Sequence, residues 1–158
     1  MKTPTRMLSK SDNDTVSSLL VPVQGKSLLV PNVAVAELVP ATEIEAGENL
    51  PTWCLGYVHW RGIHVPVISF ELANSQVSGR NSVESRLAIF NCIGDDQSRP
   101  YFAIMVQGIP RMIKLTDNEI REDKQTTIGQ AESMAVITQL GKAIIPNIDY
   151  LESLAAKV

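Results

Sequence analysis

Both histidines of the chain, His59 and His64, lie in the stretch HWRGIHVP, together with Trp60 and the pair Arg61-Gly62. Imidazoles bind transition metals and transfer protons, and a guanidinium binds carboxylates and carbonyls. The side chains best suited to binding or catalysis are therefore gathered in this stretch. It could be a metal site, a catalytic site, or a turn that another protein binds.

Apolar residues alternate on both sides of Arg61-Gly62, which is the two-residue period of β-strands. A two-residue loop would place Trp60 opposite Ile63, His59 opposite His64 and Val58 opposite Val65, because loop length sets the register of a hairpin. The predicted core face carries Val58, Trp60, Ile63, Val65 and Val67. The face predicted to meet solvent or a partner carries Tyr57, His59, His64, Pro66 and Ile68.

A pair of histidines alone does not predict a metal centre. A structural zinc site needs four nitrogen or sulfur ligands, and a catalytic site needs three ligands plus water. Cys54 precedes the strand, Cys92 is far along the chain, and no Cys-x-x-Cys or His-x-x-x-His spacing occurs. We therefore expect a plain cross-strand histidine pair, with no metal and no cofactor.

Enzyme motifs do not occur in the sequence. There is no Gly-rich phosphate loop, Gly-x-Ser-x-Gly elbow, His-Glu-x-x-His motif or dinucleotide fingerprint. Asp95 and Asp96 are neighbouring carboxylates, but beside Gly94 they are typical of a hairpin loop. Trp53 and Trp60 could stack on bases, yet packing is favoured because basic residues are not interleaved with them. We expect no catalytic residues.

With 158 residues and a net charge of -3, the chain is predicted to form one compact domain or two very small subdomains. The acidic balance provides no field to hold nucleic acid or an anionic membrane, so a protein partner or a small ligand is favoured. Two cysteines make no disulfide framework, and no apolar stretch approaches the ~20 residues needed to cross a bilayer. We expect a cytoplasmic protein without membrane insertion.

Short apolar runs separated by turn residues predict a mainly β fold. LLVPV and SLLV form a hairpin around residues 24–26, and VAVAELVP forms another strand. The second half repeats this rhythm in RLAIFNCI and YFAIMVQGIPRMIKL, followed by a hairpin in AVITQLGKAIIP that turns at Gly141-Lys142. The repetition predicts two small β-barrels in tandem.

Four further segments complete the expected organisation. Residues 1–16 are polar and predict a flexible tail, and the aperiodic stretch around residues 73–86 predicts a surface connector where two subdomains could meet. Thr116 to Glu119 has the form of a capping box, which predicts a helical turn. A C-terminal helix is predicted behind an Asn147 cap, with its apolar residues at helical spacing: Ile148, Leu151, Leu154 and Ala155.

Four stretches, taken in order, resemble the CheW family, the adaptors of bacterial chemosensory arrays. GYVHWRGIHVPVISF resembles the family's Gly-x-x-Asn-Leu-Arg-Gly-x-x-x-Pro-hydrophobic-hydrophobic-Asp stretch, and VAVAELVP resembles its strand ending in Val-x-Glu-Ile. FAIMVQGIPRMIKLTDNEIR resembles its second-barrel run with Asp-Gly-Val, and LGKAIIPNIDYLESL its final hairpin and helix. The resemblance implies two intertwined, SH3-like, five-stranded barrels over residues 17–158.

The resemblance also implies a non-catalytic adaptor that links the cytoplasmic tip of a methyl-accepting chemoreceptor to a CheA-like histidine kinase. Arg61 matches the family's hairpin arginine at the receptor-facing groove, and Gly56 and Gly62 match its turn glycines. Glu37 and Val35 match the end of the strand beside it. The exposed imidazoles of the hairpin complete the predicted partner-binding set: His59 and His64.

Four positions depart from the family pattern: His59 replaces Asn, Trp60 replaces Leu, and Ser69 and Gln107 each replace Asp. We expect these changes to alter which partner is accepted. They resemble a divergent branch, such as the adaptors of chemosensory systems that control type IV pili. The alternative function is a small-ligand-binding or nucleic-acid-binding β-barrel without a signalling role, although the acidity and the missing stacking residues argue against nucleic acid.

Overall fold

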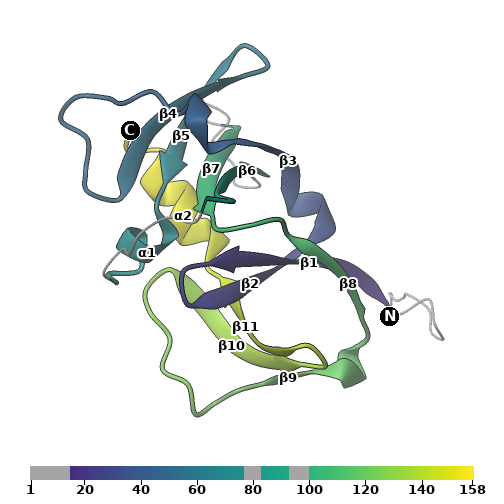
Figure 1. The fold of residues 1–158 in the computed structure, drawn as a ribbon. Coiled ribbons are helices and arrows are strands. Elements are labelled where there is room, and N and C mark those ends of the chain that lie inside the picture. Colours follow the sequence, from purple (N-terminus) through teal and green to yellow (C-terminus); the bar gives the residue numbers. More distant parts are fainter. Residues whose placement is uncertain (1–14, 77–82, 93–99) are drawn as a thin grey trace, which may run out of the picture.

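A computed structural model describes residues 15–76, 83–92 and 100–158, and strands dominate it (Figure 1). One sheet has the strand order β8-β1-β2-β11-β10-β9 and the other β3-β6-β7-β5-β4. The six-stranded sheet contains β1 (Val16–Val23), β2 (Lys26–Pro31), β8 (Arg111–Leu115), β9 (Ile120–Glu122), β10 (Glu132–Thr138) and β11 (Gly141–Pro146). The five-stranded sheet contains β3 (Val35–Pro40), β4 (Cys54–Trp60), β5 (Ile63–Ile68), β6 (Arg86–Asn91) and β7 (Tyr101–Val106).

Short helices complete the fold. The α-helices are α1 (Phe70–Ala73) and α2 (Ile148–Ala155), and the 3-10 turns are η2 (Asn32–Ala34), η3 (Ala41–Glu43) and η4 (Asp117–Glu119). The capping box at Thr116 is present, as predicted. Most of the predicted tail lies outside the described residues, and Val16 already begins β1. The mainly β prediction is confirmed, with β9 as an additional strand in one sheet.

Each sheet takes strands from both halves of the chain. The chain passes from one sheet to the other between β2 and β3, and again between β7 and β8. The connector around residues 73–86, of which 77–82 lie outside the described residues, joins two parts of the same five-stranded sheet. It is therefore not the place where the subdomains meet. The two sheets are therefore intertwined along the chain.

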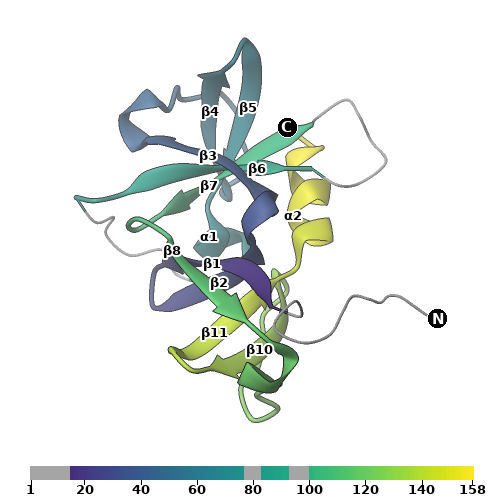
Figure 2. The ribbon, with the colours of Figure 1, turned by 90° about the vertical axis from the view of Figure 1, so that its right-hand side faces the viewer.

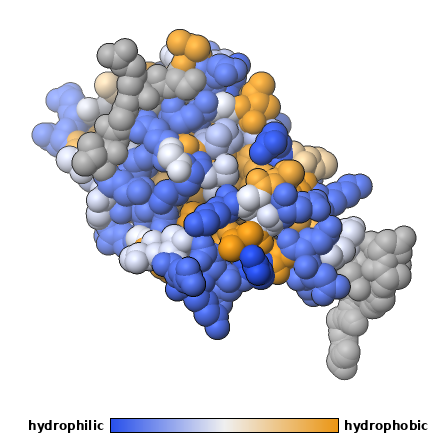
Figure 3. Space-filling view, turned by 60° about the horizontal axis from the view of Figure 1, so that its bottom comes forward, coloured by the Kyte–Doolittle hydropathy of each residue, from blue (hydrophilic) through white to orange (hydrophobic). Residues whose placement is uncertain are grey.

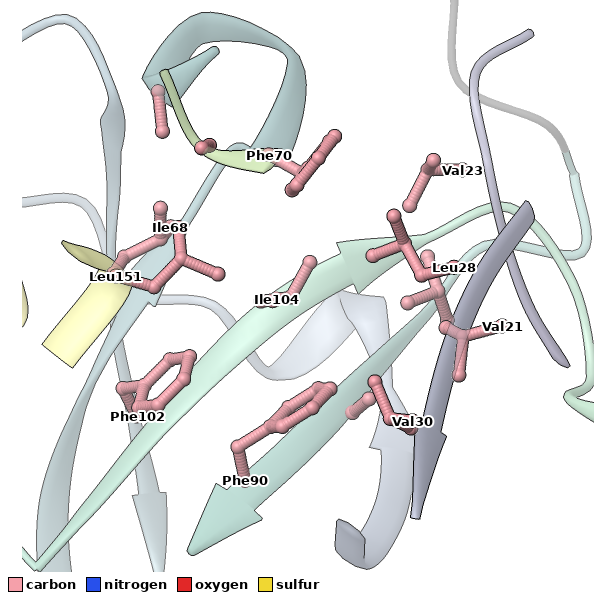
Figure 4. Packing of buried hydrophobic residues seen from close by; sticks show 14 of the residues in the cluster. Val21, Val23, Leu28, Val30, Ile68, Phe70, Phe90, Phe102, Ile104 and Leu151 are labelled. Carbon is pink, nitrogen blue, oxygen red and sulfur yellow. The ribbon is translucent and has the colours of Figure 1, made fainter. Parts of the chain in front are cut away.

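The largest apolar cluster, the central core cluster, belongs to both sheets and to α2 (Figure 4). Its largest fully buried side chains include Leu28, Ile68, Phe70, Phe90, Phe102 and Leu151. The helix packs against β5 and lies along one side of the five-stranded sheet (Figure 2). Asn147 caps it by accepting a hydrogen bond of 3.0 Å from the Tyr150 N–H. The predicted C-terminal helix is thus confirmed, and its burial ties the two sheets together.

Each sheet also packs around a smaller apolar cluster of its own. The cluster of the five-stranded sheet includes Val58, Trp60, Val65, Leu87 and Ile89, and that of the six-stranded sheet includes Leu20, Leu29, Ile113, Leu115 and Val136. Seen from the end formed by the six-stranded sheet, apolar residues reach the surface as patches among hydrophilic ones (Figure 3).

The last hairpin turns two residues earlier than predicted. Thr138 pairs with Gly141, so the turn residues are Gln139 and Leu140 rather than Gly141 and Lys142. Gly141 has a φ of +111° and already begins β11. Glycine tolerates this conformation at the end of a turn, so its presence indicates the hairpin but not its central residues.

Candidate functional site: the β4–β5 hairpin

The β4–β5 hairpin has the predicted register, with Trp60 opposite Ile63, His59 opposite His64 and Val58 opposite Val65. It projects at the end of the molecule far from the six-stranded sheet (Figure 1, Figure 2). Arg61 and Gly62 have φ values of +51° and +76°, as a type I′ turn requires. Arginine rarely adopts positive φ, and such strain costs on the order of 1 kcal/mol at a single residue.

The core face of the hairpin is confirmed, because Val58, Trp60, Val65 and Val67 are buried and Ile63 is half-buried. The opposite face is divided. His59 and His64 near the tip are exposed, whereas Pro66 and Ile68 are buried. The expectation that this whole face meets solvent is therefore wrong at the base of the hairpin, where the central core cluster and α2 cover it.

The side chain of Arg61 is held in place although it is 67% exposed. Its Nη2 donates to Oε1 of Glu37 at 3.3 Å, and the same oxygen accepts a hydrogen bond of 3.0 Å from Nε1 of Trp60. The guanidinium carbon lies 4.5 Å from the centre of a Trp60 ring, a cation–π contact. Arg61 thus presents most of its five-donor fork to solvent in an oriented position.

Glu37 reaches Arg61 because the five-stranded sheet curls. Glu37 lies on β3 and Arg61 follows β4, and these two strands are the opposite edges of the sheet. The sheet must close on itself for their side chains to meet. Glu37, expected on the strand beside the hairpin, makes this contact, whereas Val35 is half-buried and packs against the central core cluster.

Gly56 is not a turn glycine. It lies inside β4, at a bulge opposite β5, with a φ of +138°. A Cβ atom added there would lie 2.3 Å from the carbonyl oxygen of Glu45. Glu45 and Tyr57 exchange backbone hydrogen bonds of 2.7 and 2.9 Å next to this point. The glycine is needed because another segment of the chain approaches the strand backbone.

This approach brings Glu45 to the histidine pair. Its Oε1 lies 3.4 Å from Nε2 of His59, and the ligand atoms of Glu45, His59 and His64 all lie within 4.8 Å of one another. The imidazole centres are 4.9 Å apart, and Tyr57 stacks on His64 at 4.1 Å. Glu45 therefore adds a third possible ligand to the histidine pair. No spacing in the sequence indicated Glu45, because it comes from a separate segment.

Two of the departures from the family pattern lie in the framework. Ser69 is buried and caps α1 by accepting a hydrogen bond of 3.2 Å from the Leu72 N–H, a role that aspartate also performs. The side-chain oxygen of Gln107 accepts a hydrogen bond from the Ser85 hydroxyl at 3.2 Å, and the backbone N–H of Gln107 donates to the Pro22 carbonyl at 2.8 Å. The other two departures, His59 and Trp60, are part of the hairpin.

A pocket of about 290 Å³ lies in the six-stranded sheet, away from the hairpin. Its charged lining residues are Lys26, Glu132, Asp123 and Lys142. Lys26 pairs with Glu132, and Nζ of Lys142 lies 3.9 Å from Oδ2 of Asp123. The charges of the pocket therefore balance one another, which gives a charged small ligand little to bind.

The fold is thus mainly β, with two intertwined sheets and an oriented arginine at an exposed hairpin. The chain belongs to the CheW-like domain family, whose model matches residues 17–157. The crystal structure of the scaffolding protein TtCheW from Thermoanaerobacter tengcongensis has the same fold. Its TM-score is 0.69 at 20% identity, over 83% of this chain and 88% of that one. No match was found among curated proteins.

Family membership defines the broad role. The chain is a CheW-like scaffold or adaptor protein of chemosensory signalling, and the family is non-catalytic, which confirms the expectation that it is not an enzyme. Within the described residues, no helix has the length and apolar character needed to cross a membrane.

Proposed function

We propose that this protein couples the cytoplasmic tip of a methyl-accepting chemoreceptor to a CheA-like histidine kinase. CheW-like proteins in general couple chemoreceptors to CheA kinases. The observation that carries the proposal for this chain is the oriented guanidinium of Arg61, held by Glu37 and Trp60 at the end of the hairpin.

Arg61 suits recognition of another protein for two reasons. Its planar fork can donate two parallel hydrogen bonds to a carboxylate, or bind the carbonyls at the end of a partner helix. Its contacts with Trp60 and Glu37 also restrict its rotamers before a partner arrives, so binding loses less side-chain entropy. The strained backbone at Arg61 is consistent with a functional role, because asparagine or glycine would be less strained there.

The proposal places the protein in the cytoplasm, because the receptor tips are cytoplasmic, with attachment to the membrane array only through its partners. It needs neither nucleic acid nor a cofactor for coupling. Two departures at the hairpin, His59 and Trp60, change the surface around Arg61. These two departures favour a role in a divergent chemosensory array, of the kind that controls type IV pili.

Substitutions at Arg61 test the proposal when binding is measured to the histidine kinase, and to a cytoplasmic receptor fragment, from the same organism. Arg61→Ala should weaken binding by about 2 kcal/mol, or roughly 30-fold, as expected for an interface arginine. Arg61→Lys should not restore affinity, because lysine lacks the planar fork. Arg61→Asn should bind as poorly as Arg61→Ala and melt no lower than the wild type, since asparagine tolerates positive φ.

Calorimetric titration measures the loss of binding, and thermal melts measure any loss of stability separately. Arg111→Ala is the matched control, because Arg111 is an exposed arginine on β8 of the other sheet. It should leave binding unchanged. If Arg61→Ala unfolds the protein while the folded fraction binds normally, Arg61 is structural and the proposed role of the hairpin fails.

A further inference from the structure

Three side chains that can ligate a metal gather on the exposed side of the hairpin tip: Glu45, His59 and His64. We propose that they form a binding site for a divalent transition metal ion such as Zn²⁺. This inference does not rest on the proposed adaptor function, since metal binding can be measured on the isolated protein.

The backbone positions of the three ligands are set by β-pairing. His59 and His64 lie directly opposite each other, and Glu45 is joined to Tyr57 by two backbone hydrogen bonds. In a hairpin with a two-residue loop, the pair next to the closing pair is non-hydrogen-bonded, and its side chains lie closest together. The ligands therefore come from three adjacent extended segments, and only their side chains must move to bind an ion.

The distances are close to those of a bound ion. Zinc–ligand bonds of about 2.0–2.2 Å in a tetrahedral site place ligand atoms roughly 3.3–3.6 Å apart. The Glu45–His59 separation is already 3.4 Å, and the three ligand atoms lie within 4.8 Å. Both the Glu45 and His59 side chains are 61% exposed, so they can rotate inward without repacking the core.

The ligand types define the class of ion. Two imidazoles and one carboxylate form the set found in open zinc sites, where a fourth position remains for water or another group. Calcium and magnesium prefer oxygen ligands, whereas imidazole favours zinc, copper and nickel. Tyr57 stacks on His64 and restricts the orientation of its ring.

The competing explanation is a surface contact between Glu45 and His59 that binds no ion. A Zn²⁺ titration of the full-length, untagged protein distinguishes the two. We expect one ion per chain, and an affinity at least tenfold lower in each of His59→Asn, His64→Asn and Glu45→Gln. His59→Asn installs the residue that is usual in the family, so the fold should tolerate it.

Glu48→Gln is the matched control, because Glu48 is an exposed glutamate of the same segment outside the cluster. It should bind zinc like the wild type. Co²⁺ provides a second readout, since a tetrahedral site should give strong visible absorption that His64→Asn abolishes. The proposal is overturned if Zn²⁺ does not bind at one per chain, or if the three ligand variants bind as well as Glu48→Gln does.

Discussion

Two ends of one face of β5 differ completely in their surroundings. His64 and Ile68 lie four residues apart on the same side of the strand, yet His64 is exposed and Ile68 has no exposed surface. Ile68 belongs to the central core cluster beside α2, whereas His64 stacks between Tyr57 and His59 at the free end of the hairpin. The alternation of a strand decides which side a residue faces, but packing elements decide whether that side is covered.

This difference separates a base that stabilises the fold from a tip that contributes little to stability along a single hairpin. Burial of a side chain such as that of Ile68 contributes roughly 1.5–3 kcal/mol, whereas exposed polar contacts contribute little. The tip can therefore carry a strained arginine and an exposed imidazole pair, because the base and the barrel core hold the strands in place.

Ile68→Ala should produce the largest loss of stability. Its site is enclosed by both sheets and α2, so the cavity cannot collapse easily, and we expect a loss of about 4 kcal/mol. His64→Ala, on the same face, should change the free energy of unfolding by less than ~0.5 kcal/mol. Urea denaturation of both variants measures the contrast, and similar losses would show that the base is not distinct from the tip.

Trp60→Ala should cost about 3 kcal/mol, somewhat less than Ile68→Ala, because Trp60 lies nearer the rim of the barrel and its cavity can admit water. Trp60→Phe retains most of the apolar surface but loses the indole N–H that donates to Glu37, so it should cost about 1 kcal/mol. Thermal melts can compare the two variants. Equal losses would mean that the hydrogen bond to Glu37, rather than burial, dominates.

Gly56→Ala should have a smaller effect of about 2 kcal/mol. The added methyl group would meet the Glu45 carbonyl oxygen, and the positive φ adds strain. Gly62→Ala should add only backbone strain, because an added methyl group would have no neighbour within 4 Å. We expect it to lower the free energy of unfolding by about 1 kcal/mol. Denaturation curves should rank Gly56→Ala as the more damaging change, and the reverse order would remove the argument for close approach.

Local patterns in the sequence were sufficient for several features. The two-residue loop determined the register that pairs His59 with His64, and apolar spacing behind Asn147 determined the C-terminal helix. These features depend on neighbours in the chain: turn geometry, helical periodicity and capping. Family motifs in their order along the chain also indicated the adaptor class.

Only the tertiary structure decided what distant segments bring to the hairpin. Closure of the five-stranded sheet joins Glu37 to Arg61 across its two edges, and the backbone of Glu45 meets β4 because Gly56 has no side chain. The burial of Ile68 likewise depends on α2, which is far along the chain. No regular spacing of residues in the sequence indicates such contacts, because they arise when separate elements pack to cover shared apolar surface.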